Sequence, residues 1–251
     1  MTERRDDTVA IVLAAGQGTR MKSDLAKVLH PMAGEPLLAH VLRALRDTGV
    51  RRTLVVIGHQ RERVREAFAD AHVEWVIQAE QRGTGHAIQM AEPALRGFTG
   101  TLLVVCGDTP LLRGETLTAL LDRHRRSGAA VTILSTRVPD PSGYGRIVRE
   151  PGGIVRIVEE RDATPEIKAI DEINSAIYAF QYPILEAALS QLTSHNAQGE
   201  YYLTDTPALI QQAGHKVEVE CAPDWKELLG VNTPAQLAEL EAIYVRRGAG
   251  S

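Results

Sequence analysis

The sequence predicts an α/β fold with a mostly parallel sheet that is covered by helices on both faces. The first half of the chain alternates short apolar runs with segments of helical periodicity. The apolar runs are nearly continuous Val, Ile and Leu, which is typical of strands buried on both faces. The chain has 251 residues, enough to bury such a core in one domain.

The first half is predicted to hold five buried strands and four helices in alternation. Gly49 is expected to end the first helix, and Thr84 is expected to be the N-cap of the third. The predicted strands are 9–13, 53–57, 73–77, 101–105 and 130–136, and the predicted helices are 36–45, 61–69, 84–94 and 115–126.

The second half is predicted to be richer in antiparallel structure. A hairpin is expected over 145–149 and 154–159, because Glu-Pro-Gly-Gly separates the two runs. A last helix is expected to begin at Thr233-Pro234, in the preferred cap and first-turn order. Between them we expect a strand at 172–180, helices at 183–192 and 205–213, and a strand at 216–220; the closing Gly-Ala-Gly-Ser is expected to be disordered.

Composition argues against several classes of protein. The net charge is −4, and the arginine-rich stretches 61–65 and 123–126 are interleaved with acidic and apolar residues, so we expect no nucleic-acid partner. The two cysteines suggest neither a disulfide framework nor a metal motif. The N-terminus is polar and no apolar run approaches about 18 residues, so we expect a cytoplasmic protein with no membrane partner.

The stretch from Leu13 to Leu29 carries the first functional signal. Gly16 and Gly18 allow backbone N–H groups to converge on an anion, although a tight turn is the structural alternative. Arg20 and Lys27 supply two cations for phosphate oxygens. No Gly-Lys-[Ser/Thr] follows, and Met21 stands where a dinucleotide-binding fingerprint has glycine. The stretch therefore predicts a triphosphate site of another class.

Two further loops follow predicted strands and are expected to converge on the same crevice. Gln78 and the Gly83-Thr84 pair are suited to recognising a base, whereas His86 is expected to be a packed helix residue. Asp108 either caps a turn or binds Mg²⁺ together with substrate phosphates, and the opposing cations favour the metal.

The β-rich part offers residues suited to a sugar. Tyr144 lies between two glycines, Glu159 ends a strand on a charge, and Asn174 lies inside an apolar run, where a buried amide needs partners. Plain turns are the alternative for the Gly143–Gly145 segment and for Asn232, which precedes the last helix.

Taken in order, these motifs resemble the N-terminal half of the GlmU family, the bacterial bifunctional N-acetylglucosamine-1-phosphate uridyltransferases and glucosamine-1-phosphate acetyltransferases. The resemblance is carried by 13–29, 78–86, 107–112, 143–147, 157–163, 172–174, 196–205 and 230–232. It implies a Rossmann-like, GT-A-like nucleotidyltransferase fold with a small β-rich sugar-binding insertion. It also implies Mg²⁺-dependent synthesis of UDP-N-acetylglucosamine from UTP and N-acetylglucosamine 1-phosphate, for peptidoglycan and lipopolysaccharide.

The resemblance also implies roles for individual residues. The expected catalytic residues are Arg20, Lys27 and Asp108, and the expected Mg²⁺ ligands are Asp108 and Asn232. The expected nucleotide contacts are Leu13, Ala14, Ala15, Gly16, Gly18, Lys27, Gln78, Gly83 and Thr84, and the expected sugar contacts are Gly107, Gly145, Glu159 and Asn174. We expect one domain over 1–251, with a nucleotide-binding part (1–140), a sugar-binding part (141–232) and a C-terminal linker helix (233–251).

The chain departs from the family pattern in several places. Ala26 replaces a usual proline, which predicts a looser Lys27 loop; Cys106 replaces a tyrosine, and Ala176 replaces a glycine. The hexapeptide-repeat half of the family has no counterpart in this chain. Acetyl transfer is therefore expected to lie outside it, and the chain is expected to be a monomer or weak oligomer. The alternatives are a same-fold enzyme for another nucleotide or sugar phosphate, and a non-catalytic nucleotide-binding module.

Overall fold

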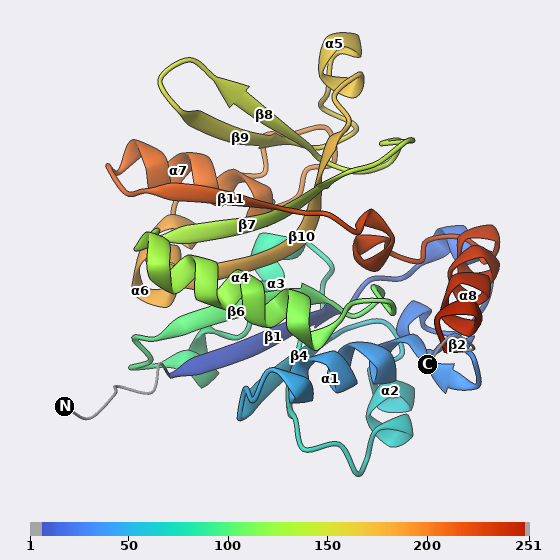
Figure 1. The fold of residues 1–251 in the computed structure, drawn as a ribbon. Coiled ribbons are helices and arrows are strands. Elements are labelled where there is room, and N and C mark those ends of the chain that lie inside the picture. Colours follow the sequence, from blue (N-terminus) through green and yellow to red (C-terminus); the bar gives the residue numbers. More distant parts are fainter. Residues whose placement is uncertain (1–6, 249–251) are drawn as a thin grey trace.

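A nine-stranded, mostly parallel sheet forms the centre of residues 7–248, the part of the chain that the computed structural model describes (Figure 1). Residues 249–251, most of the segment expected to be disordered, lie outside this part. Along the sheet the strands are ordered β11 (Val217–Ala222), β7 (Val131–Arg137), β10 (Glu172–Gln181), β6 (Thr101–Cys106), β1 (Thr8–Ala14), β4 (Arg52–Ile57) and β5 (Glu74–Ile77).

Strand β10 is the exception to the parallel arrangement of this path. It runs antiparallel to both β6 and β7, whereas β1, β4, β5 and β6 pair in parallel, as do β7 and β11. The hairpin of β8 (Arg146–Glu150) and β9 (Ile154–Val158) joins β10 where Arg146 lies opposite Ile173. The predicted mixed sheet and its β-rich insertion are therefore confirmed.

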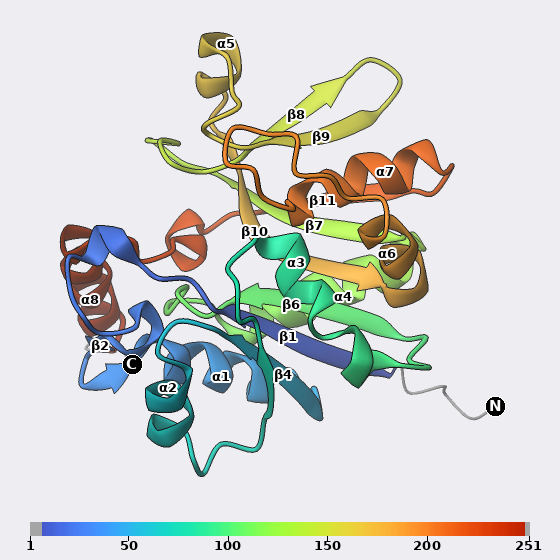
Figure 2. The ribbon, with the colours of Figure 1, turned by 180° about the vertical axis from the view of Figure 1, so that it is seen from behind.

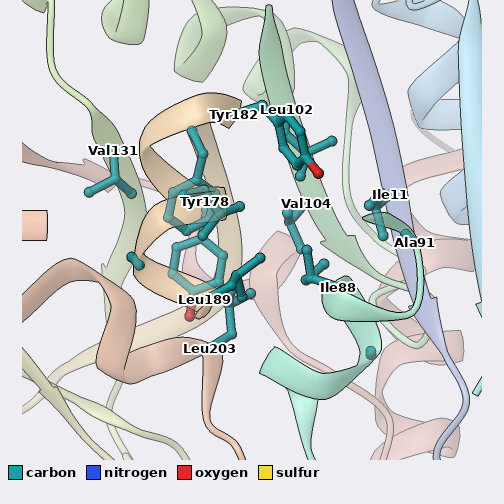
Figure 3. Close-up of a cluster of buried hydrophobic side chains, with 14 of the residues drawn as sticks. Ile11, Ile88, Ala91, Leu102, Val104, Val131, Tyr178, Tyr182, Leu189 and Leu203 are labelled. Atoms are coloured by element: carbon teal, nitrogen blue, oxygen red, sulfur yellow. The ribbon is translucent and has the colours of Figure 1, made fainter. Parts of the chain in front are cut away.

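Helices cover both faces of the sheet, because alternate strand residues point to opposite sides. One face packs on α1 (Leu37–Asp47), α2 (Arg61–Ala67) and α4 (Gly114–Ser127), and the other on α3 (Thr84–Gln89), α6 (Tyr182–Leu189) and α7 (Thr206–Gln212) (Figures 1 and 2). Figure 3 shows the hydrophobic core between the sheet and α3, α6 and α7, in which Ile88 and Ala91 lie beside Ile11.

A third, smaller core lies at the C-terminal helix α8 (Pro234–Gly248). Its residues Leu240 and Ile243 pack with Met21, Met32 and Leu37, next to the ribbon of β2 (Pro31–Met32) and β3 (Glu35–Pro36). The remaining helix, α5 (Pro165–Lys168), is capped by the Thr164 side chain. Within residues 7–248, no helix combines the length and apolar character needed to cross a membrane.

Several predicted helices are shorter than expected. The helix expected over 84–94 ends at Gln89, and the chain continues as the 3₁₀ turn η3 (Glu92–Leu95). Pro93 explains this, since a proline ring clashes with the carbonyl four residues earlier and provides no N–H. Thr84 is not the N-cap: Gly83 takes that place at φ +105°, a conformation that favours glycine. The helix expected to reach 192 ends at Leu189.

Candidate active site

A pocket of about 500 Å³ opens where β1, β5 and β6 end. The three loops that were expected to converge line it together. All nine residues predicted to contact the nucleotide are among its lining residues, namely Leu13, Ala14, Ala15, Gly16, Gly18, Lys27, Gln78, Gly83 and Thr84.

The loop after β1 is shaped by its two glycines in different ways. Gly18 has φ +64°, and a Cβ on it would lie 2.7 Å from the Cβ of Lys27, so only glycine lets the lysine stem pass. A Cβ on Gly16 would have nothing within 4 Å, which places this backbone beside open space. The turn η1 (Thr19–Met21) then carries Arg20, which is exposed.

The segment before Lys27 is anchored by a side chain. Ala26 has φ −53°, within the range of proline, but its N–H donates to Oε1 of Gln60 at 3.1 Å. The side-chain amide of Gln60 also donates a hydrogen bond, from Nε2, to the carbonyl of Asp24. Hydrogen bonds to Gln60 therefore hold the loop in this chain, where the family pattern has a proline ring.

Four of the predicted catalytic and metal-binding side chains meet in one polar cluster. The Lys27 ammonium pairs with the Asp108 carboxylate, and each of these side chains is 16% exposed. Lys27 Nζ also donates to Asn232 Oδ1 at 3.2 Å, and Arg20 Nη2 donates to the same oxygen at 3.0 Å. Residues more than 200 positions apart in the chain are thus brought to one point.

The cluster has the donor set that Mg²⁺ prefers. The oxygens of Asp108 and Asn232 converge on a single cationic centre, the Lys27 ammonium. One carboxylate and one amide oxygen, completed by substrate phosphates and water, are typical of Mg²⁺ sites in proteins. The described residues 7–248 contain no group of three or more His, Cys, Asp and Glu side chains suited to a metal.

Asn232 is held in place by the start of α8. Thr233 Oγ1 accepts from the N–H of Gln236 at 3.2 Å, and Gln236 Oε1 accepts from the N–H of Thr233 at 3.1 Å, a reciprocal capping box. The Val231 N–H donates to the Asp108 carbonyl at 2.9 Å. The predicted Thr233-Pro234 helix start is confirmed, and it fixes Asn232 against the segment that bears Asp108.

The opposite end of the pocket is lined by Gln78, whose side chain is nearly inaccessible. Its Nε2 lies 3.0 Å from the Gly83 carbonyl and 3.0 Å from Nδ1 of His86. Burial, which is the larger cause, and the charge of Arg82 lower the pKa of His86, while hydrogen bonding to the Glu80 backbone raises it. His86 is not a lining residue; it packs behind Gln78, as the sequence predicted for a helix residue.

Glu200 lines one side of the pocket, and Tyr201 and Leu203 after it are hydrogen-bonded to the segment at the start of α3. The Gly85 N–H donates to the Tyr201 carbonyl at 2.8 Å, and the Leu203 N–H donates to Thr84 Oγ1 at 3.1 Å. A Cβ on Gly83 would lie 2.5 Å from the Tyr201 carbonyl oxygen, so this approach requires glycine. These contacts hold Glu200 in the pocket, where burial raises its pKa. Sequence reasoning missed Glu200 as a lining residue, although its motif was part of the resemblance.

Three of the four predicted sugar residues lie together in the β-rich part. Asn174 N–H donates to the Gly145 carbonyl at 2.8 Å, and a Cβ on Gly145 would lie 3.5 Å from Glu159 Oε2. Glu159 accepts from Thr204 Oγ1 at 3.0 Å, and burial raises the pKa of its carboxyl group. The amide of Asn174 is used within its own strand: Nδ2 donates to the Tyr178 hydroxyl at 2.7 Å and Oδ1 accepts from the Ala176 N–H at 3.2 Å.

The fourth, Gly107, lies apart from this group at the end of β6. Its N–H donates to the Leu13 carbonyl at 2.9 Å, and a Cβ on it would meet Ala14 and Val28 at 3.3 Å. The preceding residue, Cys106, lines the pocket, and its Sγ lies 3.7 Å from the carbonyl of Ala176 in β10. Burial raises the pKa of this thiol to about 12.

Comparisons with known proteins agree with this architecture. The chain is 50% identical over 244 residues to the bifunctional protein GlmU of Pelobacter propionicus, covering 96% of this chain and 53% of that protein. It is 52% identical over 244 residues to the bifunctional protein GlmU of Thermobifida fusca, covering 94% of this chain and 50% of that protein. The chain thus spans about half the length of the curated relatives it matches, and the predicted resemblance to the GlmU family is confirmed.

A solved structure shows the same fold. A putative glucose-1-phosphate thymidylyltransferase from Bacillus anthracis, in complex with a sucrose, superposes with a TM-score of 0.76 at 18% identity, covering 94% of each chain. The predicted Rossmann-like nucleotidyltransferase fold is therefore confirmed. The sequence profile of the MobA-like NTP transferase domain matches residues 10–151, more than half of the chain. The chain therefore belongs to the MobA-like NTP transferase family, and it is a nucleotidyltransferase.

Proposed function

We propose that the chain transfers the uridylyl group of UTP to N-acetylglucosamine 1-phosphate, forming UDP-N-acetylglucosamine and pyrophosphate. The observation that carries the proposal is the convergence of all nine predicted nucleotide contacts, Lys27 among them, in one pocket that Asp108 also lines. Its GlmU relatives, at about half identity, favour this pair of substrates.

The reaction we propose is a single displacement at the α-phosphorus of UTP. A phosphate oxygen of the sugar phosphate forms a bond to this phosphorus, and the bond from it to the bridging oxygen of the β-phosphate breaks, so pyrophosphate leaves with the electron pair. The attacking phosphate is already ionised, so no protein base and no covalent enzyme intermediate are required. Arg20 and Lys27 are suited to stabilising the negative charge that develops on the phosphate oxygens.

Mg²⁺ is the metal that the Asp108 and Asn232 oxygens suit. When bound, it would neutralise phosphate charge. The entry of a metal requires Lys27 to leave its position between these two oxygens, and the phosphates of UTP offer the ammonium an alternative partner. Lys27 would then contact the substrate directly.

The two ends of the site suit the two substrates. Gln78 and the backbone of Gly83 face the pocket where a uracil ring would lie, and Thr84 supports the adjoining wall. Gly145, Glu159 and Asn174 would lie on the sugar side, where the partly buried carboxylate of Glu159 can accept a sugar hydroxyl or amide hydrogen. Gly107 would act by holding Asp108 close to β1.

Pyrophosphate release tests the proposal. Purified chain is incubated with UTP and each of several sugar phosphates, with Mg²⁺ or EDTA, beside Asp108→Ala and the exposed control Asp70→Ala. We expect Mg²⁺-dependent release that favours N-acetylglucosamine 1-phosphate, falls by about 10²–10³-fold in Asp108→Ala and is unchanged in Asp70→Ala. Release with another sugar or nucleotide would keep the mechanism and refute the substrates. No release from folded protein would refute the enzyme proposal for this chain alone.

The cellular setting follows the same proposal. We infer a cytoplasmic enzyme that supplies an activated amino sugar for peptidoglycan and lipopolysaccharide. We also infer that the chain alone is a monomer or weak oligomer, with neither nucleic acid nor membrane as partner. Sedimentation of the purified chain tests the oligomeric state.

A further inference from the structure

The side-chain amide of Gln78 has a fixed orientation. Its nitrogen lies 3.0 Å from the carbonyl oxygen of Gly83, and a carbonyl oxygen can only accept hydrogen bonds. The atom that faces Gly83 must therefore be the amide nitrogen, which donates one of its two hydrogens there. The alternative orientation would place two acceptor oxygens against each other.

The second amide hydrogen points to His86. The Gln78 nitrogen lies 3.0 Å from Nδ1 of the imidazole, so Nδ1 must carry a lone pair and the ring proton must sit on Nε2. The imidazole is partly buried behind Gln78, between the loop that follows β5 and α3. Burial, and after it the charge of Arg82, lowers the pKa of His86 and so disfavours the imidazolium form, in which Nδ1 would become a donor.

Both donors of Gln78 are thus consumed inside the protein. Because Gln78 lines the pocket, the amide oxygen is the group it has left to offer a ligand. The N–H of Gly83 has no hydrogen-bond partner among residues 7–248, and Gly83 also lines the pocket. An acceptor from Gln78 and a donor from Gly83 are thus the groups that these two lining residues have left for a ligand. A uracil ring has a matching N–H beside a C=O, whereas the ring nitrogen of cytosine at that position is an acceptor.

We propose that His86 is a positioning residue that selects uracil over cytosine, by holding the amide of Gln78 with its oxygen toward the pocket. This inference depends on the nucleotide site in the proposed function but not on the sugar or on catalysis. Without an acceptor at position 86, the Gly83 carbonyl alone holds the amide nitrogen of Gln78. The second N–H then has no partner inside the protein, and a rotation of the amide about its bond to the side chain can offer this hydrogen to the ring nitrogen of cytosine. The base selectivity of the pocket would then weaken.

Nucleotide binding without any sugar phosphate tests the role of His86. Calorimetric titration with UTP and with CTP is carried out on the full chain and on His86→Leu and His86→Asn. Asparagine keeps an acceptor oxygen near the place of Nδ1, whereas leucine has none. We expect the full chain to prefer UTP, His86→Leu to lose about tenfold or more of that preference, and His86→Asn to retain most of it. A merely structural histidine would change the affinity for both nucleotides together and leave their ratio intact.

Two results would overturn the inference. One is an unchanged UTP-to-CTP ratio in His86→Leu, and the other is a full chain without a preference for UTP. A measurement that needs no variant supports or refutes it independently: ¹⁵N NMR at neutral pH should find the His86 proton on Nε2, and a proton on Nδ1 would contradict the argument. If the ratio follows His86 but no pyrophosphate is released with any sugar phosphate, the catalytic proposal fails and this one stands.

Discussion

Replacing Lys27 by methionine is expected to strengthen divalent-metal binding in the absence of nucleotide. The Lys27 ammonium lies between the Asp108 carboxylate and the Asn232 amide oxygen, the two groups we propose as metal ligands. It therefore competes with a metal for the same oxygens. Methionine keeps most of the apolar stem and removes the charge, so the two oxygens are left free for a cation.

The size of the effect follows from Coulomb's law. Two unit charges about 4 Å apart interact by about 1 kcal/mol in bulk water, so a divalent ion beside an ammonium is disfavoured by about 2 kcal/mol. The side chains of Lys27 and Asp108 are each only 16% exposed, so water screens them incompletely and this value is a lower bound. Since about 1.4 kcal/mol corresponds to a factor of ten, Lys27→Met should bind Mn²⁺ about thirtyfold or more tighter.

Electron paramagnetic resonance of free Mn²⁺ measures this affinity directly and does not depend on activity. The matched control is Lys22→Met, which removes an exposed lysine from the same loop and should leave Mn²⁺ binding unchanged. The double variant Lys27→Met/Asp108→Asn should lose the gain, because it removes the carboxylate. An affinity of Lys27→Met equal to that of the unmodified chain would refute the reasoning, since Lys27 would then not occupy the metal's place.

Four further substitutions test the site through stability and UTP binding. Burial raises the pKa of Glu159, so the folded protein binds a proton more readily than the unfolded chain and loses stability as the pH rises; Glu159→Gln should raise the Tm near neutral pH by about 2–4 °C, and this gain should vanish in acid. Gly16→Ala should leave the Tm unchanged and weaken UTP binding, whereas Gly18→Ala should lower the Tm, because φ is +64° and Lys27 is in the way. Ala176→Gly should raise the Tm by up to about 4 °C, since alanine at φ +58° is strained.

Thermal melts over a pH series and UTP titrations distinguish these effects from general damage. A Tm gain in Glu159→Gln that persists unchanged in acid would contradict a titration origin. Equal Tm values for Gly16→Ala and Gly18→Ala would contradict the distinction drawn from their surroundings. A lower Tm for Ala176→Gly would show that the side chain contributes more than its backbone strain costs.

Much of the fold could be predicted because its strands are buried on both faces. Runs such as 101–105 contain only Thr, Leu and Val, and that continuity indicates a parallel sheet. The ends of helices were harder to predict. For example, α3 ends before Pro93, earlier than its apolar pattern suggests. The short ribbon of β2 and β3 was missed, because two-residue strands carry no periodicity.

The site divides in the same way between local and long-range information. The loop from Leu13 to Gly18 carries its own signal, in glycines and in the strand before it. Glu200 does not, because its place in the pocket depends on hydrogen bonds from Tyr201 and Leu203 to a loop more than 100 residues earlier. The positioning role that we propose for His86 could not be predicted either, since the pattern of a helix gives no sign that its histidine contacts Gln78.

The irregular strand β10 connects the β-rich part with the pocket at the end of β6. The register between β10 and β7 shifts between Asn174 and Ile177, and Ala176 adopts a left-handed conformation there. Asn174 stabilises this bulge with both ends of its amide, through Tyr178 and the backbone of Ala176. On one side of the bulge the Ala176 carbonyl reaches Cys106 at the nucleotide pocket; on the other the Asn174 backbone bonds to Gly145. The buried side-chain amide that looked anomalous in the sequence therefore stabilises the bulge, and the backbone beside it makes the contacts with Gly145 and Cys106.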